Sequence, residues 1–193
     1  MAEIILFHHA QGLTPGVQSF AEALRRPGHR VHTPDLYDGN TFDTLDEGMA
    51  YARDVGFDTV TQRGLDAADR IDAPLVYAGV SLGVMAAQQL AQTRDRARAA
   101  LLIDACLPVA EFSPSWPGGV PVQIHGTEGD PYFAEEGGDI DSARELAAAT
   151  ADAELFVYPG DTHLALDASL SGYNQATAEQ VTQRAVTFLA SLS

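Results

Sequence analysis

Short apolar runs alternate along the chain with longer segments in which apolar residues recur at helical spacing. The apolar runs predict strands at residues 3–9, 73–80, 98–105, 120–127 and 153–160, and residues 29–39 predict a further strand that runs into a loop. The helical spacing falls at residues 16–28, 58–71, 82–94, 142–150 and 174–192. Asp58 or Thr59 is the expected N-cap of the second of these helices. Residues 40–57 are acidic and weakly patterned, so the sequence assigns no element to them.

Several of the predicted strands lack polar alternation, as in Leu-Leu-Ile at residues 101–103 and Val-Gln-Ile at residues 122–124. Such runs are typical of strands that are covered on both faces. Strands that alternate with helices predict an α/β fold with a mostly parallel central sheet flanked by helices. The sequence contains no internal repeat and no convincing linker, so we expect residues 1–193 to form a single domain.

Composition and charge narrow the function classes. The formal net charge is −16, which argues against nucleic acid or an anionic membrane as a partner and makes a strongly anionic substrate less expected. The single cysteine, Cys106, excludes an internal disulfide framework and agrees with a reducing compartment. The first residues carry an acid instead of the positive charge of a signal peptide, and no apolar run approaches the roughly 18 residues of a membrane span. We therefore expect a cytoplasmic protein.

A serine lies between two glycines at the junction of a predicted strand and a predicted helix. The stretch Gly79-Val80-Ser81-Leu82-Gly83 has the G-x-S-x-G pattern of a tight turn that lifts a serine hydroxyl out of a sheet. Side chains at the two glycines would collide with the neighbouring strand and helix. Such a turn also places the Leu82 amide at a helix N-terminus, where it can stabilise an oxyanion. The alternative is that Ser81 is an ordinary N-cap residue.

A serine nucleophile needs a base and an orienting acid, which follow it in the order acid and then histidine in this fold class. His163 lies just past a predicted strand, at the edge of the sheet where Ser81 is expected, whereas His125 lies within or at the end of a strand. The loop after the preceding strand offers Glu128 and Asp130. Asp130 is preferred because the Asp-Pro pair fixes an extended turn that can hold a carboxylate. Asp104 is the competing acid.

Five stretches resemble the dienelactone hydrolase family of α/β-hydrolases, and together they run through nearly the whole chain. They are "ILFHHAQGLTPG", "HRVHTPDLYDG", "YAGVSLGV", "IHGTEGDPYF" and "YPGDTHLAL". The resemblance implies an α/β-hydrolase fold with little or no cap, and a catalytic triad of Ser81, Asp130 and His163. It also implies that the amides of Leu82 and Ala10 form the oxyanion hole and that no cofactor or metal is required.

The chain departs from the family's namesake enzymes at three positions. Ser81 stands where they have a cysteine, His9 where they have a glutamate, and Asp167 where they have an arginine that helps bind an anionic substrate. With the net charge, these departures favour a small neutral ester, lactone or thioester, cleaved through an acyl-serine intermediate.

The remaining expectations concern the pocket and the partners. We expect residues 40–57 and 107–121 to be the pocket walls, and the possible pocket residues are His9, Gln11, Tyr37 and Trp116. No histidine, cysteine or carboxylate pattern has metal-ligand spacing. The alternatives are a hydrolase-fold binding or regulatory protein without turnover, and an acyltransferase or peptidase that uses the same triad. We expect a monomer or a small homo-oligomer.

Overall fold

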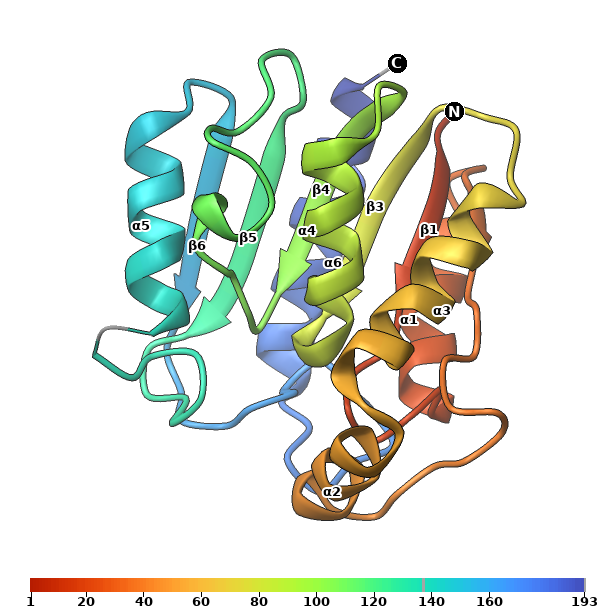
Figure 1. Cartoon of the computed structure of the whole chain (residues 1–193). Coiled ribbons are helices and arrows are strands. Elements are labelled where there is room, and N and C mark those ends of the chain that lie inside the picture. The colour runs from red at the N-terminus through yellow and green to blue at the C-terminus, as the bar shows by residue number, and fades with distance from the viewer. Residues whose placement is uncertain (137, 193) are drawn as a thin grey trace.

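Six parallel strands form one central sheet in the computed structural model of the chain, which describes residues 1–136 and 138–192. The strand order is β2-β1-β3-β4-β5-β6, and each neighbouring pair is parallel. The strands are β1 (Glu3–Phe7), β2 (Arg30–His32), β3 (Leu75–Val80), β4 (Ala97–Ile103), β5 (Val122–Thr127) and β6 (Ala153–Tyr158). Their carboxyl ends therefore open at one edge of the sheet, at the bottom of Figure 1.

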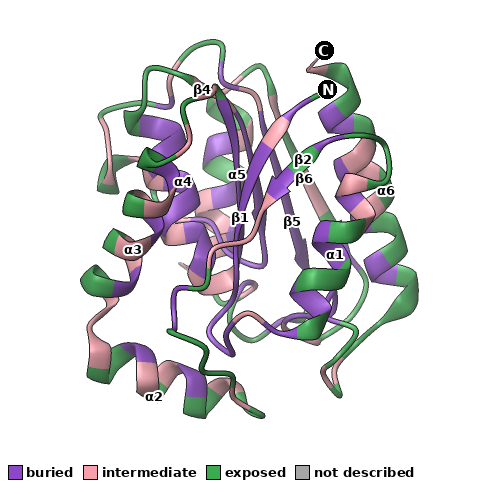
Figure 2. Ribbon diagram, turned by 90° about the vertical axis from the view of Figure 1, so that its right-hand side faces the viewer, coloured by how far each residue is buried: buried purple, intermediate pink, exposed green. Residues whose placement is uncertain are grey.

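Helices cover both faces of the sheet (Figures 1 and 2). On one face lie α1 (Pro15–Arg25) and α6 (Gln175–Ser191), and on the other lie α3 (Phe57–Asp69), α4 (Val84–Thr93) and α5 (Asp139–Ala149). A further helix, α2 (Leu45–Val55), lies beyond the carboxyl ends of the strands. Two short 3-10 turns, η1 (Ser81–Gly83) and η2 (Val109–Glu111), complete the helical elements of the described residues.

The sheet is buried between two hydrophobic clusters, one on each face. Along β1, Ile4 and Leu6 join the cluster under α1 and α6, whereas Ile5 and Phe7 join the cluster under α3 and α4. This double burial explains why the strand segments are apolar without alternation. The expected α/β fold, with a mostly parallel sheet flanked by helices, is confirmed.

The sequence prediction missed one helix and placed one cap wrongly. Residues 40–57 contain α2, whose start is fixed by a capping box: the Thr44 hydroxyl accepts the Glu47 N–H, and the Glu47 carboxylate accepts the Thr44 N–H. The helix buries only Gly48 and Ala52, fewer residues than any other α-helix among the described residues. The N-cap of α3 is Gly56, and not Asp58 or Thr59.

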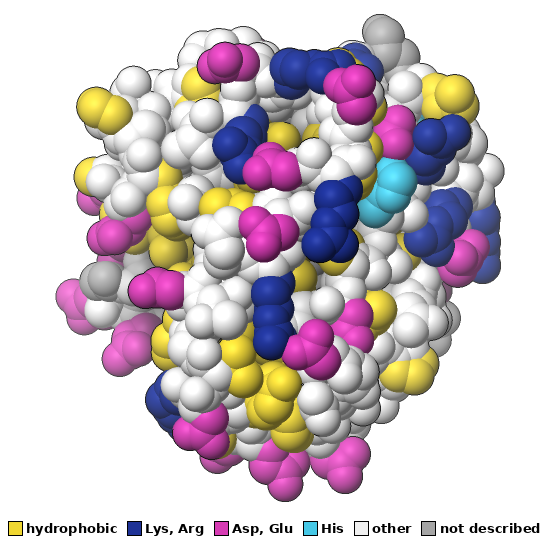
Figure 3. Space-filling model, turned by 45° about the vertical axis from the view of Figure 1, so that its right-hand side comes forward, with side chains coloured by type: hydrophobic (Ala, Val, Ile, Leu, Met, Phe, Trp, Pro, Cys, Tyr) yellow, Lys and Arg dark blue, Asp and Glu magenta, His cyan; other side chains and the backbone are white. Residues whose placement is uncertain are grey.

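Charged side chains are spread over the surface. Figure 3 shows acidic side chains scattered over one face, several of them next to arginines. Two such exposed pairs are Arg94 with Asp69 and Arg96 with Asp72. No helix among the described residues is long and apolar enough to cross a bilayer.

The turn between β3 and α4 is packed so closely that its glycines leave no room for side chains. A Cβ atom on Gly79 would lie 2.5 Å from the Gly83 carbonyl oxygen, and one on Gly83 would lie 2.4 Å from the Phe7 carbonyl oxygen. Both contacts are with backbone atoms, which cannot rotate away. The collision expected at the flanking glycines is therefore confirmed, and the turn is held against both β1 and α4.

Gly83→Ala should destabilise the protein by at least about 3 kcal/mol, because the new methyl group forces β1 and η1 apart. Gly118→Ala is the matched control, since nothing lies within 4 Å of a Cβ atom placed on Gly118. Urea unfolding of the two variants measures the difference. Equal midpoints for the two variants would show that the packing of this turn is not close.

Candidate active site

Ser81 follows β3 and adopts a backbone conformation that residues other than glycine rarely take. Its φ is +49°, in the left-handed region, and it is the first residue of η1. The close backbone packing around Gly79 and Gly83 holds the turn in this conformation. Ser81 is partly exposed at the carboxyl edge of the sheet, where the loops after the other strands also converge.

Three side chains from separate loops form a hydrogen-bonded chain. His163, in the loop after β6, is joined through Nε2 to Ser81 Oγ at 2.8 Å and through Nδ1 to Asp130 Oδ2 at 2.6 Å. Asp130 is buried, and its other oxygen accepts the Tyr132 N–H at 2.8 Å. Because a carboxylate can only accept, Nδ1 carries the imidazole proton and Nε2 is free to accept the serine proton.

The surroundings of His163 favour its protonated form. Burial alone favours the neutral imidazole, but the hydrogen bond to Asp130 and the negative charges of Asp104, Asp130 and Asp139 outweigh it. The pKa of His163 therefore lies above its usual value of 6.5. The hydrogen bond is made by Asp130, whereas Asp104 makes none to the ring and Glu128 is exposed.

The two amides expected to bind an oxyanion follow the adjacent strands β1 and β3. Leu82 is in the first turn of η1, where backbone N–H groups have no partner within the helix. Ala10 is buried in the loop after β1, and β1 pairs with β3. Helix α2 packs directly on this loop, because a Cβ atom on Gly48 would lie 2.0 Å from the Ala10 carbonyl oxygen.

A cavity of about 220 Å³ adjoins Ser81 and His163. Helix α2 contributes Leu45 and Met49 to its wall, so the region 40–57 does line the pocket. From residues 107–121, only Leu107 lines it. The other lining residues are Leu82, Met85, Asp104, Ala105, Tyr132 and Asp139.

Four residues expected as possible pocket residues lie elsewhere. Tyr37 is fully buried and packs its ring against Tyr51 at a centroid distance of 4.8 Å. Trp116 packs in the core under α4 and donates its indole N–H to the Val120 carbonyl at 2.6 Å. Both aromatic rings are core residues and line no part of the cavity beside Ser81.

His9 and Gln11 do not line the cavity, and their side chains are hydrogen-bonded to residues outside the first loop. The Gln11 amide donates to the Phe42 carbonyl at 3.1 Å, and the Gln11 N–H donates to His9 Nδ1 at 3.2 Å. His9 donates from Nε2 to Asp167 at 2.8 Å. No local sequence pattern indicated this pairing, because the two residues are 158 positions apart.

Several residues of the pocket wall were not named individually by the sequence prediction. Leu45 and Met49 lie in the region 40–57, which was expected as a wall but assigned no element, and Asp139 lies at the start of α5. The capping box at Thr44 and Glu47 was an available signal for the helix that carries the first two. Tyr132, with its ring 4.9 Å from that of His163, is two residues past Asp130 and could have been inferred from that proximity.

Asp167 forms a buried clamp with residues from the first loop. One carboxylate oxygen accepts hydrogen bonds from His9 Nε2 and the Thr14 hydroxyl, and the other accepts the N–H and the hydroxyl of Ser169. Burial opposes ionisation, but these hydrogen bonds outweigh it and lower the pKa of Asp167 to about 2. The clamp joins the loop that carries Ala10 to the loop that carries His163.

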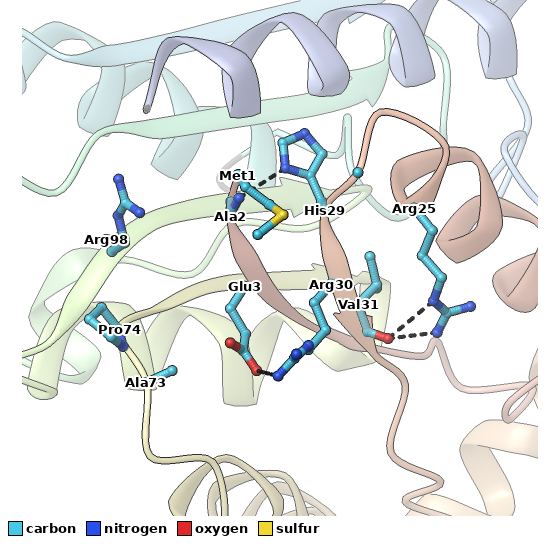
Figure 4. A pocket seen from close by; sticks show the side chains of 11 residues that line it. Met1, Ala2, Glu3, Arg25, His29, Arg30, Val31, Ala73, Pro74 and Arg98 are labelled. Carbon is cyan, nitrogen blue, oxygen red and sulfur yellow. Dashed lines mark hydrogen bonds and ion pairs between the residues drawn. The ribbon is translucent and has the colours of Figure 1, made fainter.

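A larger hollow of about 570 Å³ lies at the opposite end of the sheet, where β1 and β2 begin (Figure 4). Arg25, Arg30 and Arg98 line it, but Arg25 bonds the Val31 carbonyl and Arg30 pairs with Glu3. Among the described residues, no serine, threonine or cysteine lines it. The smaller cavity beside Ser81 is therefore the candidate active site.

Among the described residues, no group of three or more histidine, cysteine, aspartate or glutamate side chains is arranged to hold a metal ion.

Comparisons with known proteins give a family and a fold. Residues 1–193 match the family model described as the dienelactone hydrolase family. A search of curated proteins found no match. The recognised resemblance is thereby confirmed over the whole chain.

Solved structures share the fold at low identity. A dienelactone hydrolase from Anabaena variabilis is 18% identical, with a TM-score of 0.73, over 98% of this chain and 86% of that one. A protein of the alpha/beta hydrolase superfamily from Xanthomonas campestris is 22% identical, with a TM-score of 0.69, over 99% of both chains. Est1E from Butyrivibrio proteoclasticus is 17% identical, with a TM-score of 0.65, over 99% and 88%.

Asp167→Asn should lower the free energy of unfolding by about 2 kcal/mol at pH 7. The pKa of folded Asp167, about 2, lies below the ordinary 3.8, so ionised Asp167 stabilises the fold above about pH 4. This contribution is lost as the pH falls toward 2, and the difference between wild type and variant should shrink accordingly. Urea unfolding between pH 3 and 7 measures it.

The exposed Asp43 provides the control, and Asp43→Asn should change stability by less than about 0.5 kcal/mol. A difference between wild type and Asp167→Asn that stays constant with pH would refute the clamp's electrostatic contribution.

Proposed function

Since the chain belongs to the dienelactone hydrolase family, we propose that it hydrolyses a small ester, lactone or thioester through an acyl-serine intermediate. The single observation that carries this proposal is the hydrogen-bonded chain from Ser81 through His163 to Asp130. A serine hydroxyl becomes a useful nucleophile only when a base takes its proton and a third group orients that base. All three groups are present here in the order that the fold class uses.

In the acylation stage, Ser81 Oγ attacks the substrate carbonyl carbon as its proton passes to His163 Nε2. The carbonyl oxygen becomes an oxyanion, for which the amides of Leu82 and Ala10 are the proposed donors. Removing one such donor typically costs about 3–4 kcal/mol of transition-state stabilisation. His163 then protonates the leaving oxygen or sulfur, and the acyl group remains on Ser81.

In the deacylation stage, His163 takes a proton from water as the water oxygen attacks the acyl carbon. The second tetrahedral species collapses when His163 returns the proton to Ser81 Oγ, and the carboxylic acid is released. Asp130 holds the imidazole with its proton on Nδ1 and stabilises the imidazolium in both stages. The hydrogen bond of 2.6 Å between the two side chains supports this role.

The cavity supports a small substrate. Its volume of about 220 Å³ is below the range of roughly 300–1,000 Å³ that is common for drug-sized ligands. Carboxyl groups on the wall and the net charge of −16 disfavour an anionic substrate. The position held by an arginine in the namesake enzymes is occupied by Asp167, which is closed within its clamp.

We also propose that the protein works in the cytoplasm as a monomer or small homo-oligomer. The lone cysteine, Cys106, is buried and unpaired, which suits a reducing compartment. Neither nucleic acid nor an anionic membrane is a proposed partner, because the net negative charge would oppose both.

Ser81→Ala should reduce hydrolysis of p-nitrophenyl acetate to the buffer rate, because no other nucleophile replaces the serine. Asp130→Asn should lower kcat by about 10⁴-fold, because His163 then loses the carboxylate that fixes its tautomer and stabilises its positive charge. Glu128→Gln, at the exposed acid of the same loop, should stay within about twofold of wild type. Steady-state kinetics on the purified, folded variants measure these effects.

Retained turnover in Ser81→Ala would remove the proposed mechanism. Full activity in Asp130→Asn would show that another acid orients His163.

The pH dependence should follow His163. The base must be neutral to accept the serine proton, so kcat/KM should rise as the pH passes through the pKa of His163, above 6.5. The Asp130 carboxylate raises the pKa of His163, so this pKa should fall in Asp130→Asn. The rate profile of wild type and the NMR titration of the His163 ring in both proteins test this. An unchanged ring titration would contradict the assignment.

A further inference from the structure

Two carboxyl groups, those of Asp104 and Asp139, line the cavity that contains Ser81 and His163. Asp104 directly follows β4, and Asp139 is the first residue of α5. Both interact electrostatically with His163 and with Asp130. The cavity therefore has two acids on its wall beside one imidazole, and none of the lining residues is an arginine.

Asp104 is held in place with part of its hydrogen-bonding capacity unused. Its residue exposure is 5%, and its backbone φ of +57° lies in the left-handed region. It accepts the Leu164 N–H, but its Oδ2 atom has no hydrogen-bond partner among the described residues. A buried carboxylate oxygen without a donor is costly, so this position calls for an explanation.

Asp139 lies on the same wall and has one backbone partner. It accepts the Cys106 N–H, and it is only partly exposed. Burial raises the pKa of Asp104 and the pKa of Asp139 to about 6 each. Both groups are therefore mostly ionised at pH 8, where a bound cation would recover the free energy that burial costs them.

The rest of the wall is suited to a short carbon chain. Leu45 and Met49 from α2, Met85 from α4 and Leu107 line the cavity with apolar side chains. Methionine side chains adapt to ligands of different shapes. The cavity that contains Ser81 is thus lined by both apolar and acidic side chains.

We propose that the substrate carries a positively charged amino group, which Asp104 and Asp139 bind while Ser81 attacks the ester-like carbonyl. This inference rests on the proposed hydrolase function and refines its substrate class from neutral to cationic. An ammonium group offers three hydrogen-bond donors and no acceptor, which matches two carboxylates of which one has an unpaired oxygen. The overall negative charge would also draw a cation toward the site.

Boronic acids that differ only in one substituent provide the test. The Ser81 oxygen donates an electron pair to the boron to form a tetrahedral adduct, and the serine proton passes to His163. The probes are 3-(aminomethyl)phenylboronic acid, 3-ethylphenylboronic acid and 3-carboxyphenylboronic acid. Inhibition constants are measured on the wild-type protein at pH 8 by competition with p-nitrophenyl acetate.

The aminomethyl compound should bind at least about tenfold more tightly than the ethyl compound, and the carboxy compound more weakly than either. In Asp104→Asn and in Asp139→Asn, the ratio of the ethyl to the aminomethyl constant should fall below about three. In Glu128→Gln the ratio should remain that of wild type. Because the ratio compares two ligands on one protein, a general loss of Ser81 reactivity cancels.

A second measurement needs no variant. In wild type the same ratio should fall as the pH drops from 8 to 5, because Asp104 and Asp139 become protonated near pH 6. Protonation of His163 weakens the adducts of the ethyl and the aminomethyl compound alike. Asp130 also acts on both adducts equally, so neither group changes the ratio. A constant ratio over this range would overturn the inference.

The two proposals fail in different ways. If no boronic acid binds the folded protein, the activated serine is refuted and the substrate inference falls with it. If the ethyl compound binds and the aminomethyl compound binds no more tightly, the hydrolase stands and the cationic substrate is wrong. A preference that survives both aspartate variants would also overturn it.

Discussion

The close backbone approach between β1, β3 and the start of α4 is the constraint on which the candidate site depends. Gly79 and Gly83 allow main chains to meet at distances that any side chain would prevent. The turn between them holds Ser81 at a φ of +49°, so its hydroxyl stands clear of the sheet. Strain at this one residue is thus maintained by packing that extends across three elements, and the nucleophile is placed before any substrate arrives.

The other parts of the site are brought to Ser81 by the parallel sheet. Because every strand ends at the same edge, the loops after β1, β3, β5 and β6 can supply Ala10, Ser81, Asp130 and His163 to one place. The buried clamp of Asp167 with His9 then ties the first of these loops to the last. Where the namesake enzymes of the family place an arginine and a glutamate, this chain has Asp167 and His9, which are hydrogen-bonded to each other and do not line the cavity.

The sequence predicted the parts of this arrangement that local chemistry determines. Strands buried on both faces read as unbroken apolar runs, and the G-x-S-x-G turn and the acid and histidine that follow it have a fixed order. Residues 40–57 could not be assigned because α2 buries little and covers the site instead of the core. Tyr37 and Trp116 were misplaced for a related reason: an aromatic residue in a loop looks the same in sequence whether it packs inward or lines a cavity. The pairing of His9 with Asp167 depends on tertiary contacts between residues far apart in the chain, which no local pattern carries.

Labelling with a small fluorophosphonate tests the central claim, an activated Ser81, most directly. Intact-mass and peptide-mass analysis should find a single adduct, located on Ser81, and none in His163→Ala. Phosphonylation requires the base as well as the hydroxyl, so it reports the assembled pair and not merely an exposed serine. An adduct on another residue, or no adduct on a folded protein with a reagent shown to be reactive, would contradict the account.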